Sequence, residues 1–478
     1  MPENTRTGST KKNAHGRLLT FLALLVAGTF FMENLDATII TPAIPAMAHD
    51  FLVAPADLNL GVSIYMLTLG VFIPVSGWVA ERFGARPVFT LAIALFTVAS
   101  LLCGMAHTFW QFVAFRFLQG IGGAMMVPVG RLVVLHATPK DRLIPVMATL
   151  TWPGLVAPVL GPPLGGFLTD HSGWQWIFYL NIPLGIAACA LALRLVPSGG
   201  TSQERPFDWS GFLLTVSGLF CLLYAAELLG HNPVRWGRVG VLSAGGILLS
   251  GGAVLHFRRS PAPMLTLEAL NVPTFAVTIW GGSLFRMGVS AVPFLLPLML
   301  QMGLHYSAWK AGAMLTAVFA GNLVMKPMTT PILQLFGFRP VLLINGILNA
   351  LTIALCALIG PSLPLYALVL ILFLSGMTRS MQFTALNTIA FADIPQEEMP
   401  NANTLFSTAF QLALGLGIAL GAIAWRLGTF AFPHADALSA FRVAFLIVSA
   451  VSLAGVLDTL KLPHDAANHV AHSRKKVS

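Results

Sequence analysis

Apolar runs long enough to cross a membrane recur along almost the whole of this sequence. A helix rises about 1.5 Å per residue, so about 20 apolar residues cross the roughly 30 Å hydrocarbon core of a bilayer. Barrel strands would instead give alternating segments of about ten residues. The residues are 56% hydrophobic and only 9% charged, which is more apolar surface than one water-soluble core can bury. The chain is therefore predicted to be an all-α integral membrane protein.

Fourteen such runs define the predicted spans, and an even number places both termini on the same side of the membrane. Glycine and proline inside the runs are compatible with a helix bundle, because small residues let helices approach closely and neighbouring helices supply partners for the carbonyls that proline frees. The predicted limits are 17–46, 57–77, 87–106, 109–132, 143–169, 174–196, 209–230, 237–257, 272–300, 309–332, 340–359, 362–391, 402–428 and 438–460.

The basic residues favour one orientation of these spans. With both termini in the cytoplasm, the outside segments hold only Arg235, Arg238, Lys310, Arg426 and Arg442, and the cytoplasmic segments hold most of the rest. This is the asymmetry of the positive-inside rule. Topology thus explains the net charge of +9, so we expect membrane lipid and no nucleic acid among the partners.

One short motif occurs twice. The stretch Phe83–Val88 recurs as Phe336–Val341, each time in a basic loop between two predicted spans and eight helices apart. A duplicated six-helix half with two inserted helices gives this spacing, and internal repeats are typical of transporters that alternate access between two halves. The predicted division is a cytoplasmic N-terminal tail (1–16), an N-terminal six-helix bundle (17–196), two inserted helices with their loops (197–270), a C-terminal six-helix bundle (271–460) and a basic cytoplasmic tail (461–478).

Three stretches carry a resemblance to a known family. They are Gly77–Arg86 after the second predicted span, Arg116–Arg131 in the fourth and Gly154–Gly166 in the fifth. Over nearly its whole length the chain resembles the major facilitator superfamily, and within it the 14-span drug:proton antiporters. That resemblance implies the major facilitator fold with 6+2+6 helices. It also implies proton-coupled export of small organic compounds or drugs across the bacterial cytoplasmic (inner) membrane.

The resemblance further implies roles for two sets of residues. A cytoplasmic gate would contain Gly77, Glu81, Arg82, Gly84, Arg86, Gly337 and Arg339, and an antiporter hinge would contain Gly154, Pro158, Gly161, Pro162, Gly165 and Gly166. Prolines bend a helix and glycines let a neighbour pack against its backbone, so a hinge has a physical basis here. The gate departs from the family pattern, because Glu81 stands where aspartate is usual and Pro87 where a basic residue is common. A solvated charged turn and an ordinary kinked helix are the alternatives.

Ionisable side chains inside the predicted spans are few, and in hydrocarbon they are costly enough to indicate function. Glu33 and Asp36 lie three residues apart on one helix face. Two close carboxylates in a low dielectric resist being ionised together, which is the property that a proton-coupling site needs. We therefore predict that Asp36, Glu33 and Arg116 couple transport to protons, and by resemblance Asp36 is the proton carrier. Ion pairs that only hold the bundle together are the alternative.

The predicted substrate cavity is rich in cations. Arg116, Arg286 and Arg379 lie well inside spans that become core helices 4, 7 and 10 without the inserted pair, and the acids lie on core helix 1. By resemblance these four helices line the central cavity. The excess of cations would oppose a cationic substrate, so we expect an organic anion or a zwitterion. The predicted cavity residues are Arg286, Arg379, Gln119, Gln301, Gln382 and Asn387.

Several other polar residues are interpreted as structural. Lys326 is expected to extend its ammonium group toward the membrane surface, and Glu227 and Asp458 lie near the ends of their spans. The aromatic stretch Trp174–Pro183 is expected to anchor a span at the membrane interface. A single amide inside a span is more often a helix-to-helix hydrogen bond than a ligand contact.

Other classes of function are disfavoured. His136 and Asp141 have a spacing used by some membrane acyltransferases, yet no glycine-rich or basic partner lies nearby in the sequence, so no enzyme activity is expected. The sequence contains no phosphate-binding Gly-x4-Gly-Lys-Ser/Thr motif, so we expect no ATP among the partners and no cofactor or metal. The predicted partners are protons, a small organic substrate and membrane lipid. An exporter specific for an organic anion metabolite and a facilitator without proton coupling are the alternative functions.

Overall fold

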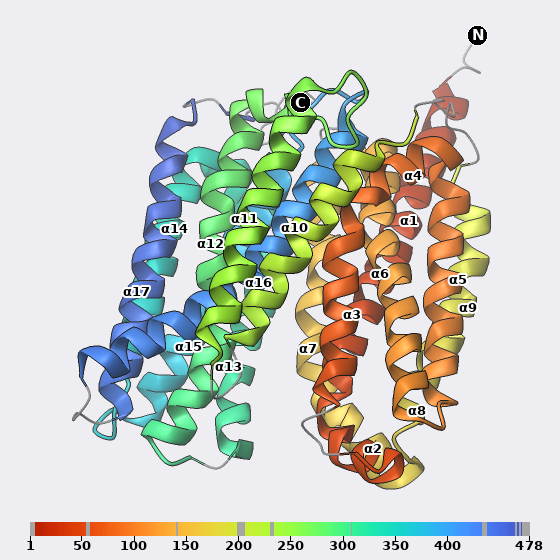
Figure 1. The fold of residues 1–478 in the computed structure, drawn as a ribbon. Coiled ribbons are helices and arrows are strands. Elements are labelled where there is room, and N and C mark those ends of the chain that lie inside the picture. The colour runs from red at the N-terminus through yellow and green to blue at the C-terminus, as the bar shows by residue number, and fades with distance from the viewer. Residues whose placement is uncertain are drawn as a thin grey trace. The chain divides into compact units, whose positions relative to one another are not determined.

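The computed structural model describes residues 5–53, 58–139, 142–197, 206–229, 234–306, 308–432, 437–463, 466–467 and 470. These residues form helices and short connections, with no β-strand in the ranges given (Figure 1). The chain divides into two compact units, Met1–Phe207 (unit 1) and Asp208–Ser478 (unit 2). The all-α architecture predicted from the apolar runs is confirmed.

The two units are built mainly from long helices. The α-helices of unit 1 are α1 (Thr5–Ile39), α2 (Ile44–Phe51), α3 (Asn59–Phe72), α4 (Ser76–Phe83), α5 (Ala85–Gly104), α6 (Phe109–Ala137), α7 (Leu143–Ser172), α8 (Trp176–Tyr179) and α9 (Asn181–Leu195). Those of unit 2 are α10 (Trp209–Leu228), α11 (Trp236–Arg259), α12 (Pro273–Leu298), α13 (Ala308–Phe336), α14 (Phe338–Leu355), α15 (Leu365–Ile389), α16 (Met399–Ala431) and α17 (Ala437–Asp458).

Prolines interrupt the first two predicted spans. α1 ends at Ile39, and a 3₁₀ turn, Thr41–Ala43, carries Pro42 before α2 begins. Pro74 lies likewise in the 3₁₀ turn Ile73–Val75 between α3 and α4. Proline lacks the backbone donor and clashes with the preceding turn, so the regular helix ends there. The first span is therefore shorter than predicted at this end.

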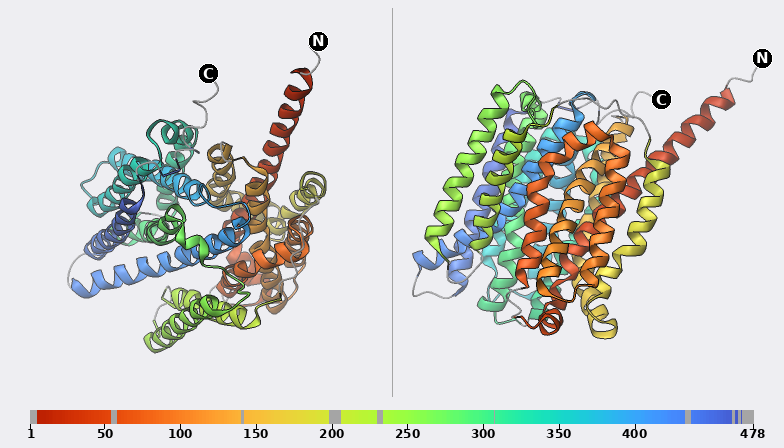
Figure 2. Two further views of the ribbon diagram at one scale, coloured as in Figure 1. Left: turned by 90° about the horizontal axis from the view of Figure 1, so that it is seen from above. Right: turned by 45° about the vertical axis from the view of Figure 1, so that its right-hand side comes forward.

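The structure describes most of the predicted N-terminal tail but not the end of the predicted C-terminal tail. The N-terminal tail predicted over 1–16 is helical from Thr5, and the start of α1 projects beyond the other helices of unit 1 (Figure 2). The basic cluster Arg474–Lys476 of the predicted C-terminal tail lies outside the described residues. So does most of the loop expected before the inserted helices, because residues 198–205 are not described.

Three helix pairings recur in the two units. In unit 1, α1 packs on α7, α3 on α6 and α5 on α9; in unit 2, α12 packs on α16, α13 on α15 and α14 on α17. The helices α10 and α11 pack on each other, and α10 also packs on α16. This is the pattern expected of two repeated bundles with an added helix pair, while the predicted boundaries of the five segments stay a prediction.

Most helices are of membrane-spanning length. In the part of the chain that the structure describes, 12 helices are long and apolar enough to cross a membrane. The two remaining predicted spans correspond to α7 and α13, which contain 30 and 29 residues. At about 1.5 Å per residue both exceed the roughly 30 Å hydrocarbon core. The total of fourteen spans stays a prediction.

Both copies of the repeated motif turn at a glycine with positive φ. Gly84, between α4 and α5, has a φ of 86°, and Gly337, between α13 and α14, has a φ of 77°. Residues with a Cβ rarely adopt this left-handed region, because the Cβ approaches the following carbonyl oxygen. The glycine of the motif is therefore required by the backbone angle of a tight turn between helices.

Replacing either of these glycines with alanine should destabilise the protein by about 1–3 kcal/mol, because a positive φ with ψ of 142° and 173° is a backbone region essentially limited to glycine. Thermal unfolding midpoints of purified Gly84→Ala and Gly337→Ala variants in detergent would measure the effect. Gly245→Ala is the control, since it lies inside α11 with nothing within 4 Å of the added methyl group, and it should be neutral or slightly stabilising. Equal midpoints for all three variants would contradict this explanation of the turns.

Candidate functional site

A buried cluster in unit 1 surrounds Asp36 of α1. Arg116 Nη1 donates to Asp36 Oδ2 at 2.6 Å. Gln119 Nε2 and Asn181 Nδ2 donate to Asp36 Oδ1 at 2.9 and 3.0 Å. Arg116 Nη1 also donates to Gln119 Oε1 at 2.7 Å. The side chains of Asp36 and Arg116 are both 0% exposed, so these four residues, the Asp36 cluster, enclose an ion pair away from solvent.

The local structure of α6 positions two members of the cluster. Thr108 caps this helix, because its hydroxyl accepts from Gln111 N at 3.3 Å and Gln111 Oε1 accepts from Thr108 N at 3.3 Å. Arg116 and Gln119 lie three residues apart on α6 and therefore share one face. Asn181 is the first residue of α9. Two helices, α6 and α9, thus supply the polar groups around Asp36 of α1.

The structure gives Asn181 a role that the sequence does not reveal. The sequence places Asn181 in an aromatic stretch that is expected to be structural, yet its Nδ2 bridges Asp36 and Ser100 Oγ, the latter at 3.0 Å. In the sequence, the sign of this role is that Asn181 is a single amide residue between apolar neighbours. Gln119, which is predicted to line the substrate cavity, is a partner of Asp36 and is 0% exposed.

Aromatic rings enclose the Arg116 guanidinium. Its Cζ lies 4.7, 5.5 and 5.9 Å from the ring centroids of Tyr65, Phe178 and Phe112. Such rings attract a cation through their quadrupoles and keep water away from it. Because a single charge is costly in these surroundings, the charges on Asp36 and Arg116 depend on each other.

Glu33 lies one turn before Asp36 on α1 and is bonded differently. Its Oε2 is buried and has no hydrogen-bond partner among the residues that the structure describes. Arg131 and Asp36 are its electrostatic neighbours. The Arg131 Cζ also lies 5.6 Å from the ring centroid of Phe30. The structure thus brings the predicted coupling residues into one region, with both oxygens of Asp36 hydrogen-bonded and Glu33 Oε2 without a hydrogen-bond partner among the described residues.

Two glycines of the predicted hinge press α7 against α1 just after Asp36. A methyl group on Gly161 would overlap the side chain of Thr38, and one on Gly165 would overlap the carbonyl oxygen of Ile39. Small residues at such positions let two helix backbones touch. At Gly165 the contact of α7 is with the backbone of α1, and at Gly161 it is with the short side chain of Thr38.

The other members of the predicted hinge are less crowded. A methyl group would have its nearest neighbour 3.4 Å away at Gly154 and 3.9 Å away at Gly166. Pro162 is exposed, and the side chain of Pro158 is outside the described part of the chain. The helix α7 continues through these prolines from Leu143 to Ser172. The close approach thus rests on Gly161 and Gly165.

The two arginines of the repeated gate motif bind helix ends in their own units. Arg86 Nη2 donates to Leu193 O near the end of α9. Arg339 Nη2 donates to Leu460 O, just after α17, at 3.3 Å. Basic side chains often satisfy the free carbonyls at helix C-termini. Of the remaining gate residues, Gly77 is buried in α4, and Glu81 and Arg82 are half-buried near its end.

Arg286 of α12 lies in the interior of unit 2 and is 0% exposed. Its Nη1 donates to Thr278 O at 3.0 Å, and its Nη2 donates to Asn387 Oδ1 of α15 at 3.3 Å. Its Cζ lies 5.0 and 5.1 Å from the ring centroids of Phe406 and Phe410 on α16. The structure therefore brings together Arg286 and Asn387, two of the predicted cavity residues.

Lys326 does not extend toward a membrane surface, contrary to the expectation from sequence. Its Nζ donates to Thr384 Oγ1 at 2.9 Å, so the ammonium group of this α13 residue points at α15. Arg379 lies on α15 like Thr384, and its Cζ is 5.7 Å from the ring centroid of Phe383. The hydroxyl of Thr384 holds the ammonium inside the unit, which apolar surroundings alone could not do.

Two other predicted cavity residues have different surroundings. Gln382 Nε2 donates to Leu342 O at 3.1 Å, and Gln382 Oε1 accepts from Asn345 Nδ2 at 2.8 Å. These bonds join α15 to α14, which is the structural role expected of a single amide. Gln301 is exposed in the π-helical turn Met299–Gly303.

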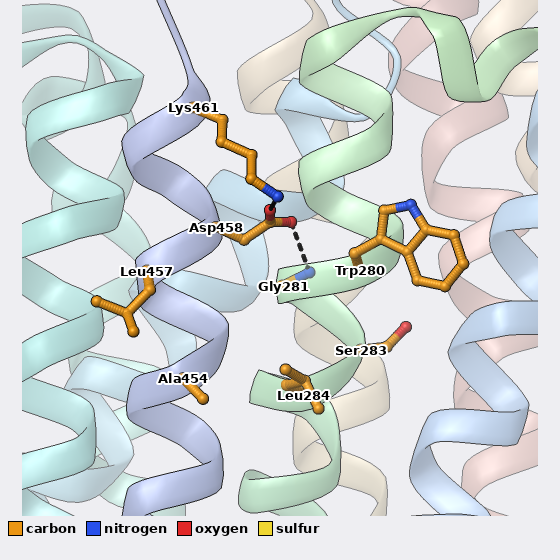
Figure 3. Close-up of a pocket in the computed structure, with 8 residues that line it drawn as sticks. All are labelled: Trp280, Gly281, Ser283, Leu284, Ala454, Leu457, Asp458 and Lys461. Carbon is orange, nitrogen blue, oxygen red and sulfur yellow. Dashed lines mark hydrogen bonds and ion pairs between the residues drawn. The ribbon is translucent and has the colours of Figure 1, made fainter.

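A hollow of about 470 Å³ opens on unit 2 between α12 and α17 (Figure 3). Asp458 Oδ1 pairs with Lys461 Nζ at 2.6 Å, and Asp458 Oδ2 accepts from Gly281 N at 3.0 Å. Trp280 and Leu457 are 63% and 61% exposed, so the hollow faces outward. It contains none of the predicted site residues. Its lining is Trp280, Gly281, Ser283, Leu284, Ala454, Leu457, Asp458 and Lys461.

Comparison with known proteins decides the family. A sequence profile described as the Major Facilitator Superfamily matches residues 26–418 and, in a second match, residues 279–477. The chain belongs to the Major Facilitator Superfamily. Its members are membrane transporters, which are not a class of enzyme.

Bacterial relatives within the superfamily match over most of their length. The chain is 35% identical to the multidrug resistance protein MdtD of Cronobacter sakazakii, over 95% of this chain and 97% of that one. It is 37% identical to MdtD of Pectobacterium carotovorum, over 86% and 87% of the two chains. The multi-pass helical structure and these relatives confirm the predicted location in a bacterial membrane.

Solved structures of superfamily members share the fold. The human organic anion transporter MFSD10 gives a TM-score of 0.67 at 14% identity, over 93% of this chain and 99% of that one. The proton:xylose symporter XylE gives a TM-score of 0.62 at 12% identity, over 97% of this chain and 100% of that one. At these identities the likeness establishes the major facilitator fold and nothing finer.

The contact between α7 and α1 gives a matched pair of variants. Gly165→Ala should lower the thermal unfolding midpoint in detergent, because overpacking costs about 1–3 kcal/mol and the overlapped atom is backbone. Gly166→Ala, one residue away, adds a methyl group at ordinary contact distance and should leave the midpoint nearly unchanged. If the two variants unfold at the same temperature, the close approach of α7 to α1 is not what these glycines provide.

Proposed function

We propose that this protein is a proton-coupled antiporter that exports small organic compounds across the bacterial cytoplasmic membrane by alternating access. The observation that supports this most directly is the Asp36 cluster, a titratable acid that is fully buried against a cation. Apolar residues would hold the helices together at least as well, so a buried ion pair favours a functional role. The MdtD relatives, which are named for multidrug resistance, support organic compounds as the substrates.

Proton uptake by Asp36 would change the cluster in a defined way. The carboxylate becomes a neutral acid, so its charge attraction for Arg116 is lost. Arg116 then keeps Gln119 Oε1 as a neutral acceptor. Leaving one charge of a buried pair without its counterion costs about 3–5 kcal/mol, which corresponds to a shift of about a hundredfold or more in a two-state equilibrium. Protonation can therefore favour a different conformation of unit 1.

The backbone contact of α7 with α1 offers a route for that change. Thr38 and Ile39 directly follow Asp36, and they lie against Gly161 and Gly165. A movement of this part of α1 would displace α7, because at Gly165 no side chain separates α7 from the Ile39 carbonyl. The hinge that the sequence predicts would then act by transmitting the state of Asp36.

The direction of transport follows from the proton gradient. In an antiporter, proton binding and substrate binding oppose each other, and this opposition is reciprocal. Protons that enter the cell down their gradient therefore drive the substrate out. Glu33 lies one turn from Asp36 and has a buried oxygen without a hydrogen-bond partner among the described residues, which supports a role for it in passing a proton to Asp36.

The variant Asp36→Asn tests the coupling. It keeps the size of the side chain and is neutral like the protonated acid, with one oxygen that accepts and an amide nitrogen that donates, but it cannot take up a proton. In proteoliposomes, transport driven by a pH gradient should fall by about tenfold or more. Exchange of labelled for unlabelled substrate without a gradient should persist, because it needs no net proton movement. The substrate for both assays is the compound that the wild-type protein moves fastest in a panel of organic anions and cationic dyes.

The control for this experiment is Glu268→Gln, which changes an exposed acid in the loop before α12 and should leave both assays unchanged. Full gradient-driven transport in Asp36→Asn would remove Asp36 from the mechanism. Wild-type transport that ignores the pH gradient would instead identify a facilitator without proton coupling.

A further inference from the structure

Two helices of unit 2, α12 and α17, touch through their backbones beside the hollow of Figure 3. A methyl group on Gly281 of α12 would overlap the carbonyl oxygen of Gly455 on α17, and one on Gly455 would overlap that of Gly281. Farther along, a methyl group on Gly288 would meet the side chain of Ser452, so residue numbers fall along α17 as they rise along α12. The two helices are therefore antiparallel, and the start of α12 lies beside the end of α17.

Small residues leave the hollow open next to this contact. Gly281, Ser283 and Ala454 line it with little or no side chain. The larger lining residues Trp280 and Leu457 are mostly exposed, so their side chains stand outward and leave the space between the helices unfilled. Its volume of about 470 Å³ lies within the range of ligand pockets, about 300–1,000 Å³. Because the hollow opens on the outer face of two membrane-spanning helices, the molecules next to it in a membrane are lipids.

An ion pair lies at one end of the hollow (Figure 3). Asp458 is the last residue of α17, and Lys461 follows one turn later. The carboxylate accepts from Gly281 N and from the Lys461 ammonium, and the side chain of Asp458 is only 12% exposed, whereas that of Lys461 is 77% exposed. Of the three donors of the ammonium, Asp458 uses one, and the other two have no partner among the described residues. The outward-facing charge is therefore an ammonium that the acid holds in place.

The ion pair lies at the depth of the lipid headgroups. The apolar segment that contains α17 ends at Lys461, and the segment that contains α12 begins at Pro273. Trp280 lies about two turns inside that start, and tryptophan is enriched where a membrane meets water. Lysine at the end of a span extends its ammonium group to the same level. A phosphate at the membrane surface can therefore reach Lys461, while hydrocarbon lies against the apolar part of the hollow.

We propose that the hollow between α12 and α17 binds one glycerophospholipid, whose phosphate binds the Lys461 ammonium and whose acyl chain lies along Leu284 and Ala454. The surrounding lipid tails are as apolar as this wall, so packing of the chain adds little selectivity. The contact of phosphate with ammonium, a charge-assisted hydrogen bond, therefore decides which lipid stays. A bound lipid would contact both helices and stabilise their pairing. This site does not depend on the proposed export function.

Native mass spectrometry of the full chain, purified in a mild detergent, counts the lipids that the protein retains. The probes are palmitoyl-oleoyl phosphatidylglycerol, the diacylglycerol with the same two chains, and glycerol phosphate, which has the phosphate without chains. Phosphatidylglycerol should bind about tenfold or more tightly than either of the others, because only it makes both contacts. Equal retention of phosphatidylglycerol and diacylglycerol would overturn the proposal. Glycerol phosphate that binds as tightly as phosphatidylglycerol would show a site for free phosphate and reject the lipid.

Variants of Lys461 test the phosphate contact. Lys461→Gln should weaken phosphatidylglycerol binding about tenfold, to the level of diacylglycerol, because the charge-assisted bond is lost. Lys461→Arg keeps the charge and should recover part of the affinity. Arg259→Gln removes an exposed cation at the end of another spanning helix, α11, and is the matched control, so it should retain lipid as the wild type does. Unchanged retention in Lys461→Gln would place the phosphate elsewhere.

A second pair of variants tests the place of the acyl chain. Ala454→Phe fills the hollow from an exposed position on α17, so it should lower phosphatidylglycerol retention without disturbing the interior of the unit. Leu453→Phe, one residue away and also exposed, lies outside the hollow and should behave as the wild type. Equal retention in both variants would reject the hollow as the site of the chain. A wild-type dimer that Ala454→Phe dissociates, with lipid retention unchanged, would assign the hollow to a second copy of the chain instead.

Discussion

A carboxylate and a guanidinium are both completely buried in unit 1, and in such surroundings neither can lose its partner cheaply. The Asp36 cluster meets this constraint with two amide donors, one shared guanidinium and three surrounding rings. Because the pair is stable only while Asp36 is ionised, one proton is enough to change its energy by several kcal/mol. This charge pair joins α1 to α6, and the proposed coupling depends on it.

The two units share a framework and differ in the chemistry they place on it. The same three helix pairings hold both units, and each repeated motif turns at a left-handed glycine and ties its arginine to its unit's last helix. Against this common background, α1 carries two acids, whereas α12 carries Arg286. Unit 1 therefore has carboxylates in its interior, while unit 2 has Arg286 beside phenylalanine rings.

The sequence predicts the helices well, because membrane-spanning length and apolar composition are local properties. It also predicts that Asp36, Glu33 and Arg116 belong together, since charges in hydrocarbon need partners. It does not predict Asn181 or the direction of Lys326, because each depends on which helix lies opposite, and hydropathy carries no such information. For the same reason Gln119 and Gln382 are assigned to a cavity, although their neighbours make them partners of Asp36 and of α14.

Substrate-induced proton release shows directly whether proton and substrate oppose each other through Asp36. The measurement uses purified protein in weakly buffered detergent solution and follows the pH after addition of the transported compound. An antiporter coupled at Asp36 should release protons as the wild type, and release should be lost in Asp36→Asn although the compound still binds. Undiminished proton release from Asp36→Asn would show that another group carries the proton.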